Sequence, residues 1–593
     1  MADKKLIEIK ERILKYAMEL WGIEDAKNMD PVVDLLLDVF AYESARLHNE
    51  IEESDSHILS RLSQILTGDK WSLPTPAHAL MSINPNRGEM RLLDAEDHFY
   101  AEKYIFGKGN TQVFFTPLFS YPLVDAQLRM TVFGNTVREY KDKQTFSSSI
   151  LQHDKETPFD TRSIWLGIAI SDEQLQKLQD LTLCIIPKDL SLLAFLKALR
   201  FCDYQGKNLS VHIGLDVKDP FNNAHYFEEI RRYYNDYYFK VEVAKATKAF
   251  FSLQQMLPDS NPVNENVDTT VKLWWIKIEL PEIFNYDNIG NLQIYLNTYP
   301  VVNRQLVYKQ HNFSNSGRII PLPCPKECHF LNIRSIQDNS GTEYVNRLQQ
   351  YDEHPTGVFS LYFGDLERFD SDDASSLISK TLQRIREDGN AFAAMNPDML
   401  ATQLQDLSAK LKEFEKDVES TDTDKDGRKQ RVFVLTVPKP EASSAEIKFW
   451  VTLGEFECEF NERTFIQQFN IDKYDAGSFQ FRTPVQKGVV HTEETDLINN
   501  LRYGLVSRDR IVSKEDIHNY ILHKIGSNVK SIEFKDGVEM APEKKKGFVR
   551  VMQIEIKLDG NHTYSDLSPL AHFLETDLTE RSVCNSSYKI IFL

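Results

Sequence analysis

Residues 30–51 read DPVVDLLLDVFAYESARLHNEI, and this stretch decides how the N-terminal part of the chain folds. Asp30 followed by Pro31 places a carboxylate at the N-cap and a proline at the first helical position, so a helix begins here. Its apolar residues then recur in alternating steps of four and three, the spacing of a narrow seam that packs on other helices. They are Val33, Leu37, Phe40, Leu47 and Ile51, with Ser44 in the same series.

A second helical seam precedes this one. Residues 4–21 are expected to form a helix with Leu6, Ile9, Ile13, Tyr16 and Leu20 on one face. Because single helices of this kind are marginal in water, both seams must be covered. Two interpretations stay open: the seams pack on each other as an αα-hairpin, or they form a bundle with helices of other chains.

Composition limits the classes of protein to consider. The 593 residues suggest three or four domains, and 41% hydrophobic residues with 11% aromatics suffice for packed cores. The formal net charge is −19. That balance argues against non-specific binding to nucleic acid or to an anionic membrane, because both favour clustered Lys and Arg.

The distribution of apolar residues and cysteines indicates a compartment. The first residues show no targeting segment, and no run approaches the ~18 apolar residues that a membrane span requires. The six cysteines are scattered, mostly inside apolar runs, which is typical of a reducing compartment. We therefore expect a cytoplasmic protein.

The fold class expected is α+β multidomain, in four parts. They are a helical arm (1–72), an α+β domain (73–260), a β-rich domain with a helical hairpin at 370–418 (261–430) and a C-terminal α+β domain (431–593). In the second part, strands are expected at 79–83, 111–115, 126–133, 164–170 and 181–186, and helices at 172 onward, 191–200 and 245–257.

The third part combines strands with a further helical seam. Strands are expected at 273–278, 292–296 and 302–308, followed by helices at 370–386 and 397–418. The second helix opens on Asn396-Pro397, and its seam is Leu400, Leu404, Leu407, Leu411, Phe414 and Val418. A polar linker follows at 419–430.

The last part predicts a β-α-β-β-α-β order after strands at 432–437, 446–452 and 456–460. Ser513 and Asp516 form a capping box that opens a helix running to Ile525. The other elements expected are strands at 510–512, 531–534, 548–558 and 588–592 and a helix at 565–578.

Patterns that would carry chemistry are incomplete. Asp422-x-Asp424-x-Asp426-Gly427 starts like a calcium loop, but its twelfth position is Phe433 rather than the bidentate glutamate. Cys324, Cys328 and His329 lack the fourth ligand of a structural zinc site. No phosphate loop, G-x-S-x-G or H-E-x-x-H occurs. We expect no catalytic residue, no cofactor, no metal and no enzymatic activity.

Four stretches together resemble one known family. They are Asp30-Pro31-x-Val33-x-x-Leu36-Leu37-x-x-Phe40-Ala41-x-x-x-Ala45-Arg46-x-His48 closed by Pro74-Thr75-Pro76-Ala77; Tyr299-Pro300-Val301-Val302-Asn303-Arg304; Ile333 to Asp338 with Gly341-Thr342-x-Tyr344; and Val512 to Ile517 followed by Gly547-Phe548-Val549-Arg550. In this order they resemble the TssF family, also called VasA or ImpG, a baseplate wedge subunit of type VI secretion. The first stretch is the most specific.

The resemblance implies a non-catalytic cytoplasmic protein at a baseplate docked on the inner membrane. Two copies would join one TssG-like subunit through a helical core bundle, and the wedge would contact a TssK-like adaptor, a TssE-like sheath initiator and a VgrG-like spike. The partner-binding residues would be those of the helical seams: Leu6, Ile9, Ile13, Val33, Leu37, Phe40, Leu47, Ile51, Leu404, Leu407 and Leu411.

Two alternatives remain beside this interpretation. One is a wedge protein of a phage tail or another contractile particle, which the genes next to this one would distinguish. The other is a baseplate-associated wall hydrolase, which would require a deep pocket with a strongly perturbed carboxylate or histidine.

Overall fold

A computed structural model describes residues 73–363 and 432–593, and residues 1–72 and 364–431 lie outside the described residues. Short internal gaps also lie outside them: 87, 89, 106–108, 143–144, 154–159, 216–223, 259, 263–266, 326–327, 348–354, 455–459, 470–471, 491–493, 508–509, 527–528, 542–546, 559–566 and 584–586. Packing divides the chain into two compact units. One comprises residues 1–72 and 493–527, and the other residues 73–492 and 528–593.

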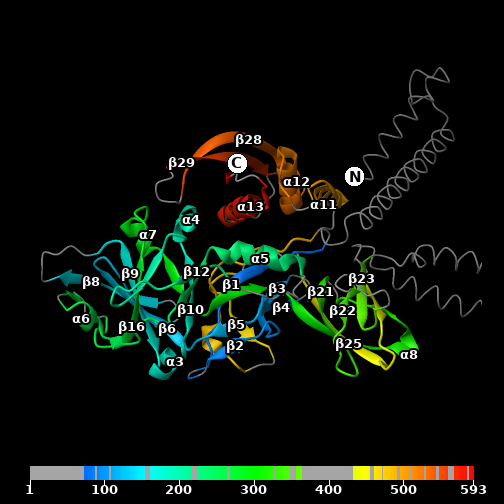
Figure 1. Ribbon diagram of the computed structural model, residues 1–593, viewed down its shortest axis with the longest axis horizontal. Coiled ribbons are helices and arrows are strands. Elements are labelled where there is room, and N and C mark those ends of the chain that lie inside the picture. The colour runs from blue at the N-terminus through cyan, green and yellow to red at the C-terminus, as the bar shows by residue number, and fades with distance from the viewer. Residues whose placement is uncertain are drawn as a thin grey trace, which may run out of the picture. The chain divides into compact units, whose positions relative to one another are not determined.

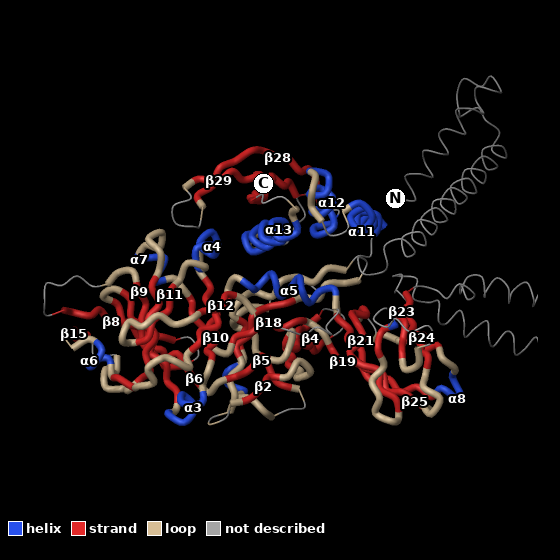
Figure 2. Tube along the Cα trace, viewed as in Figure 1, coloured by secondary structure: helices blue, strands red, loops and turns tan. Residues whose placement is uncertain are grey.

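Strands make up most of the regular structure of the larger unit (Figure 2). The longest strand order in one sheet is β11 (Arg200–Asp203), β16 (Leu273–Glu279), β9 (Ser163–Ile170), β6 (Ala126–Phe133), β7 (Thr136–Asp142), β8 (Thr145–His153) and β15 (Ser260–Pro262), with β14 (Phe250–Phe251) also on β16. Neighbouring strands in this sheet are antiparallel.

Two further sheets complete the central part of this unit (Figure 1). The six-stranded sheet has the order β26 (Ile466–Gln468), β3 (Phe99–Ile105), β4 (Gly109–Pro117), β18 (Thr298–Val302), β1 (His78–Ser82) and β27 (Gln480–Phe481). The four-stranded sheet has the order β12 (Val211–Ile213), β13 (Tyr238–Glu242), β10 (Asp180–Ile186) and β17 (Gln293–Tyr295). A two-stranded ribbon joins β2 (Arg91–Leu93) to β5 (Tyr121–Leu123).

A second β region follows β18 along the chain. One sheet has the order β19 (Gln305–Asn312), β25 (Ser444–Thr452) and β21 (His329–Asp338). Another has β20 (Ile319–Pro321), β24 (Val432–Val437), β23 (Val358–Phe363) and β22 (Val345–Asn346). Their buried residues, among them Ile447, Phe449 and Val434, form a core cluster of their own.

Among the described residues, the helices of the larger unit are short, apart from two. They are α3 (Asp172–Lys177), α4 (Leu193–Leu196), α5 (His225–Asn235), α6 (Leu253–Met256), α7 (Tyr286–Gly290), α8 (Phe313–Ser316) and α13 (Ser568–Arg581), with 3-10 turns at Leu190–Leu192 and Ala476–Ser478. We call β28 (Val529–Met540), β29 (Phe548–Leu558), α13 and β30 (Ser587–Phe592) the C-terminal module. In it, β28 pairs antiparallel and β30 parallel with β29.

Strand β16 shows why apolar runs in this chain become fully buried strands. Trp274 and Trp275 are adjacent, so their side chains point to opposite faces of the sheet. Trp274 belongs to the main core cluster and Trp275 to a second cluster on the other face. Each indole N–H is satisfied, since Trp274 donates to the Thr247 carbonyl at 3.3 Å and Trp275 to the Phe251 carbonyl at 2.8 Å.

The α+β multidomain class expected from the sequence is confirmed. The domain boundaries stay a prediction. In the described residues, strands from both sides of position 260 share sheets, because β16 pairs with β9 and β18 pairs with β1. This boundary therefore does not separate the described strands.

Two expected helices are shorter than predicted. In 191–200, helix α4 ends at Leu196, because Arg200 and Phe201 pair with Glu279 and Ile278 of β16. In 245–257, Phe250 and Phe251 also pair with β16, and only α6 remains helical. In both cases pairing with a buried strand overrides local helix propensity.

The smaller unit contains, among its described residues, α11 (Glu494–Val506) and α12 (Lys514–Ile525). The expected strand at 510–512 is wrong. The amides of Val512 and Ser513 both donate to the Asp516 carboxylate, at 3.2 and 2.9 Å, so they serve the cap of α12 instead of a strand. Helix α11 was not expected. Among the described helices, none is long and apolar enough to cross a membrane.

Candidate functional site

Arg304 is a buried cation that sits where the strands of two sheets meet. It lies two residues after the end of β18 and is 4% exposed. Its Nε donates to Thr116 Oγ1 at 2.6 Å and its Nη2 to the Pro117 carbonyl at 2.6 Å, both on β4. Three more bonds complete the set: Nη1 to the Tyr226 hydroxyl (3.0 Å) and Nη2 to the carbonyls of Leu118 and Ala95 (3.3 Å each).

Aromatic contacts connect Arg304 to the second β region. The guanidinium carbon lies 4.2 Å from the centroid of the Trp450 ring on β25, a cation–π contact. Tyr226 of α5 accepts from Arg304 and donates onward to Asn332 Oδ1 on β21 at 3.0 Å. Arg304 therefore ties β4, α5, β21 and β25 to one point.

Asn303 makes a second joint beside it. Its amide nitrogen donates to the Phe114 carbonyl at 2.8 Å, and its side-chain oxygen accepts from Thr452 Oγ1 and from the Leu453 amide at 2.9 and 3.1 Å. Its backbone N–H donates to the Ala77 carbonyl at 2.7 Å. The end of the first resemblance stretch thus meets the second stretch here.

His98 lies next to this joint, and its two hydrogen bonds fix one neutral tautomer of the imidazole. Its Nε2 accepts from the Leu306 amide at 3.1 Å, so Nδ1 carries the proton and donates to the Glu96 carbonyl at 2.7 Å. Burial lowers the pKa of this imidazole, which favours the neutral ring. With both nitrogens engaged, His98 is a structural group and has no free nitrogen for proton transfer.

The third and fourth resemblance stretches are local structural devices. Asp338 Oδ1 accepts from the Ser340 and Thr342 amides at 2.9 Å each, which closes the turn after β21. Gly341 stands in that turn at φ +79°, a conformation that favours glycine. Ser513 and Asp516 form the reciprocal capping box of α12, as expected.

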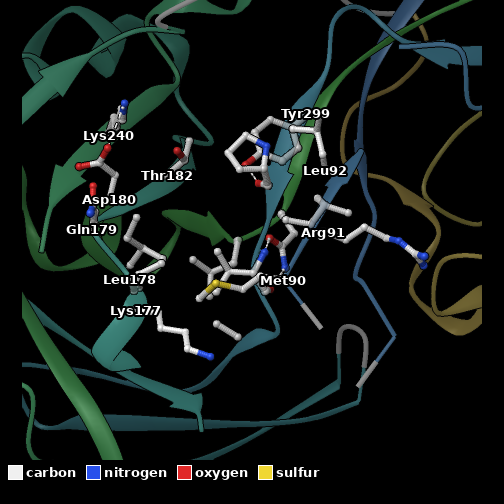
Figure 3. A pocket seen from close by; sticks show the side chains of 17 residues that line it. Met90, Arg91, Leu92, Lys177, Leu178, Gln179, Asp180, Thr182, Lys240 and Tyr299 are labelled. Atoms are coloured by element: carbon white, nitrogen blue, oxygen red, sulfur yellow. Dashed lines mark hydrogen bonds and ion pairs between the residues drawn. The ribbon is translucent and has the colours of Figure 1, made fainter. Parts of the chain in front are cut away.

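A shallow cleft of about 380 Å³ lies between the β2–β5 ribbon and the sheet that contains β10 (Figure 3). Its floor is apolar, and Met90 and Leu92 stand at its rim, 42% and 60% exposed. Among the residues that line it, the one carboxylate is Asp180, paired with Lys240 at 3.1 Å, and no histidine occurs. The cleft does not present the constellation that the hydrolase alternative requires.

The sequence-predicted site residues all lie outside the described residues. These are the seam residues Leu6, Ile9, Ile13, Val33, Leu37, Phe40, Leu47 and Ile51 of the arm and Leu404, Leu407 and Leu411 of the hairpin. The calcium-like segment at 422–427 also lies outside them. Among the described residues, no His, Cys, Asp or Glu side chains group in a way that could hold a metal ion, at Cys324, Cys328 and His329 included.

Arg304 and Asn303 belong to the stretch 299–304 that carries part of the resemblance, and the sequence predicts no role for either. A signal is present, because a charged residue two positions after the apolar run Tyr299–Val302 must find partners if it is buried. The partners themselves, on β4, α5 and β25, are distant in sequence and could not be read from the spacing.

Residues 6–100 match the family model described as "Type VI secretion system, TssF". No curated protein matches the chain.

Solved structures with a similar chain come from contractile injection systems. One is a chain of the type VI secretion TssK–TssF–TssG baseplate subcomplex, with 11% identity and a TM-score of 0.45 over 95% of this chain and 96% of that one. A second, from a type VI secretion baseplate complex, has 10% identity and a TM-score of 0.36 over 100% and 97%. A third, from the anti-feeding prophage baseplate, has 8% identity and a TM-score of 0.24 over 99% and 70%.

The match of residues 6–100 covers the first resemblance stretch, including the arm's seams and the Pro74–Ala77 turn that the structure ties to Asn303. Residues 6–100 of this chain are thus similar to the TssF family of the type VI secretion system.

Proposed function

We propose that this chain is a structural wedge component of a type VI secretion baseplate and has no catalytic role. The observation that carries the proposal is the family match of residues 6–100, which spans both seams of the N-terminal arm. The buried joint at Arg304 and Asn303 supports a mechanical role, because its polar groups form hydrogen bonds that hold two sheets together.

The arm's seams are the proposed contact with a smaller TssG-like subunit, two copies of this chain joining one copy of that partner. Apolar positions at alternating steps of four and three are what a helical bundle between chains buries. A TssK-like adaptor, a TssE-like sheath initiator and a VgrG-like spike are the further partners, and the site of action is the cytoplasmic face of the inner membrane.

Phe40→Asp tests this assignment. It places a charge in the middle of the seam, and an uncompensated buried charge is strongly destabilising to an interface. We expect the variant to lose the partner when the chain is co-expressed with its neighbouring genes and the mass of the purified complex is measured. For the native chain, the expected mass is two copies plus one smaller subunit.

Asn49→Asp is the matched control. It adds the same charge to the same predicted helix, but helical spacing puts position 49 on the face opposite the seam. The control should keep the partner. A Phe40→Asp variant that folds and still co-purifies with the partner would show that the seams are covered within the chain, and the αα-hairpin interpretation would then hold.

A further inference from the structure

The C-terminal module contacts the rest of its unit through α13, which packs against α5 and the turn at 190–192. Figure 1 shows α13 running beside α5. The closest polar contact joins Arg232 Nη1 of α5 to Asp577 Oδ1 of α13 at 2.9 Å. The Nε of Arg232 also lies 3.1 Å from Glu580 Oε2. The Asp577 side chain is fully buried, whereas that of Arg232 is 28% exposed.

A second ion cluster lies one turn further along the same contact. Asp236 caps the end of α5, and its Oδ2 lies 3.0 Å from Lys197 Nζ and 3.9 Å from His572 Nε2 of α13. Burial would raise the pKa of the Asp236 carboxyl, but the nearby His572 and Lys197 outweigh it and lower this pKa, so the carboxyl is ionised at neutral pH.

An aromatic contact also joins α5 and α13. Tyr233 and Phe573 meet with their ring centroids 5.3 Å apart. Among the described residues, no member of the main core cluster comes from the C-terminal module, although α5 contributes four. Among the described residues, the module thus stands outside the main core cluster, and the charge pairs and the Tyr233–Phe573 contact join it to α5.

Asp577, Asp236 and Arg232 would each keep an opposite charge nearby if the two helices separated. Asp577 also pairs with Arg581 of its own helix at 2.7 Å, and Asp236 would retain Lys197. Arg232 would retain the nearby charge of Glu228 on α5. Separating a buried ion pair is costly when it leaves one charge buried without a partner. The remaining pairs avoid that cost.

We propose that the α5–α13 contact is a reversible ionic latch, formed by Arg232, Asp577 and Glu580 with Asp236, Lys197 and His572. The latch holds the C-terminal module against the rest of its unit at low ionic strength and releases it as salt rises. Each pair has one partly exposed member, Arg232 at 28% and Lys197 at 50%, through which salt can screen it. The screening length falls from about 10 Å at 0.1 M to about 3 Å at 1 M ionic strength.

Hydroxyl-radical footprinting of the full chain over this salt range tests the latch directly. Phe573 is 6% exposed, so its oxidation reports opening, and Phe227, which faces the core from α5 at 2% exposed, serves as internal reference. We expect oxidation of Phe573 relative to Phe227 to rise about fivefold from low to high salt, the change that about 1 kcal/mol of pair energy implies. A ratio that does not change with salt would overturn the proposal.

Arg232→Met and Arg231→Met form a matched pair of variants. Both remove one arginine from the same helix, but Arg231 pairs with Glu228 of α5 and not with α13. Arg232→Met should show the high ratio already at low salt, with little further response to salt. Arg231→Met should behave as the native chain. An equal change in both variants would mean that loss of helix charge, and not the latch, exposes Phe573.

Discussion

Arg304 shows at the residue scale how this chain uses a buried charge. Its hydrogen-bond acceptors among the described residues are hydroxyl and carbonyl oxygens, and Trp450 covers its face. The planar guanidinium presents five donors in fixed directions, so one side chain can satisfy groups on several elements at once. A lysine offers three donors from a single nitrogen and cannot reach the same set.

Arg304→Met should therefore destabilise the larger unit by about 2–4 kcal/mol, because it leaves several buried oxygens without a donor. Arg304→Lys should recover only part of the loss. The midpoint of denaturant unfolding measures both. Arg334→Met is the control. The Arg334 side chain is 48% exposed and pairs with Glu96, so this variant removes an arginine without leaving buried oxygens unpaired. A midpoint for Arg304→Met equal to that of the control would show that the joint contributes nothing.

His78 gives a prediction for pH. Burial lowers the pKa of this imidazole to about 4, against an opposing effect of Glu229, and its Nδ1 contacts the Tyr234 hydroxyl at 2.8 Å. Because the folded pKa lies below the ordinary value of 6.5, the unfolded chain binds the proton more readily between these two values. His78 therefore costs stability as pH falls through this window, by about 3 kcal/mol in total.

His78→Gln removes the titrating group at this position and keeps a polar partner for Tyr234. Unfolding free energies measured between pH 6.5 and pH 4 should fall less steeply in this variant than in the native chain. His212→Gln, at an exposed histidine, should leave the native slope unchanged. Parallel slopes for the native chain and His78→Gln would exclude the assignment.

For single elements, the predictions that depend on a few neighbouring residues are correct in two clear cases. The capping box before α12 formed between Ser513 and Asp516, and β29 occupies the residues expected. Elements whose secondary structure depends on residues distant in the sequence are predicted less accurately. Residues 250–251 and 200–203 are strands because they pair with β16. Their own sequences contain no pattern that predicts this pairing.

Asp516→Ala should weaken the start of α12. The carboxylate accepts from the amides of Val512 and Ser513 and from the hydroxyls of Ser513 and Ser507. Losing an N-terminal cap costs about 1–2 kcal/mol. We expect faster hydrogen exchange across 514–520 in the variant. Glu515→Ala removes an exposed carboxylate from the same turn and should have a much smaller effect; equal acceleration by both variants would point to helix charge instead of the cap.

For the whole molecule, each of the two units is built from two separate segments of the sequence. Residues 493–527 belong to the unit that contains residues 1–72, although more than 400 residues separate the two segments. Each unit has its own internal packing, and units of this kind generally unfold independently.

We therefore expect two transitions when the chain is unfolded with denaturant and probed by pulsed hydrogen exchange. Peptides from β16 report the larger unit and peptides from α12 the smaller one. Arg304→Met should shift only the first transition, and Asp516→Ala only the second. Loss of protection in both sets of peptides at one denaturant concentration, shifted alike by both variants, would contradict the division.

The amino-acid sequence alone predicts the α+β class, fewer than half of the described strands, the α12 cap and the family resemblance, which the match of residues 6–100 confirms. These depend on periodicity, capping and short motifs, which act over a few residues. Tertiary structure alone decided how strands from distant parts share sheets, which residues satisfy Arg304, and which charges meet between α5 and α13. Such pairings join residues that are far apart along the chain, and no local pattern specifies the partner.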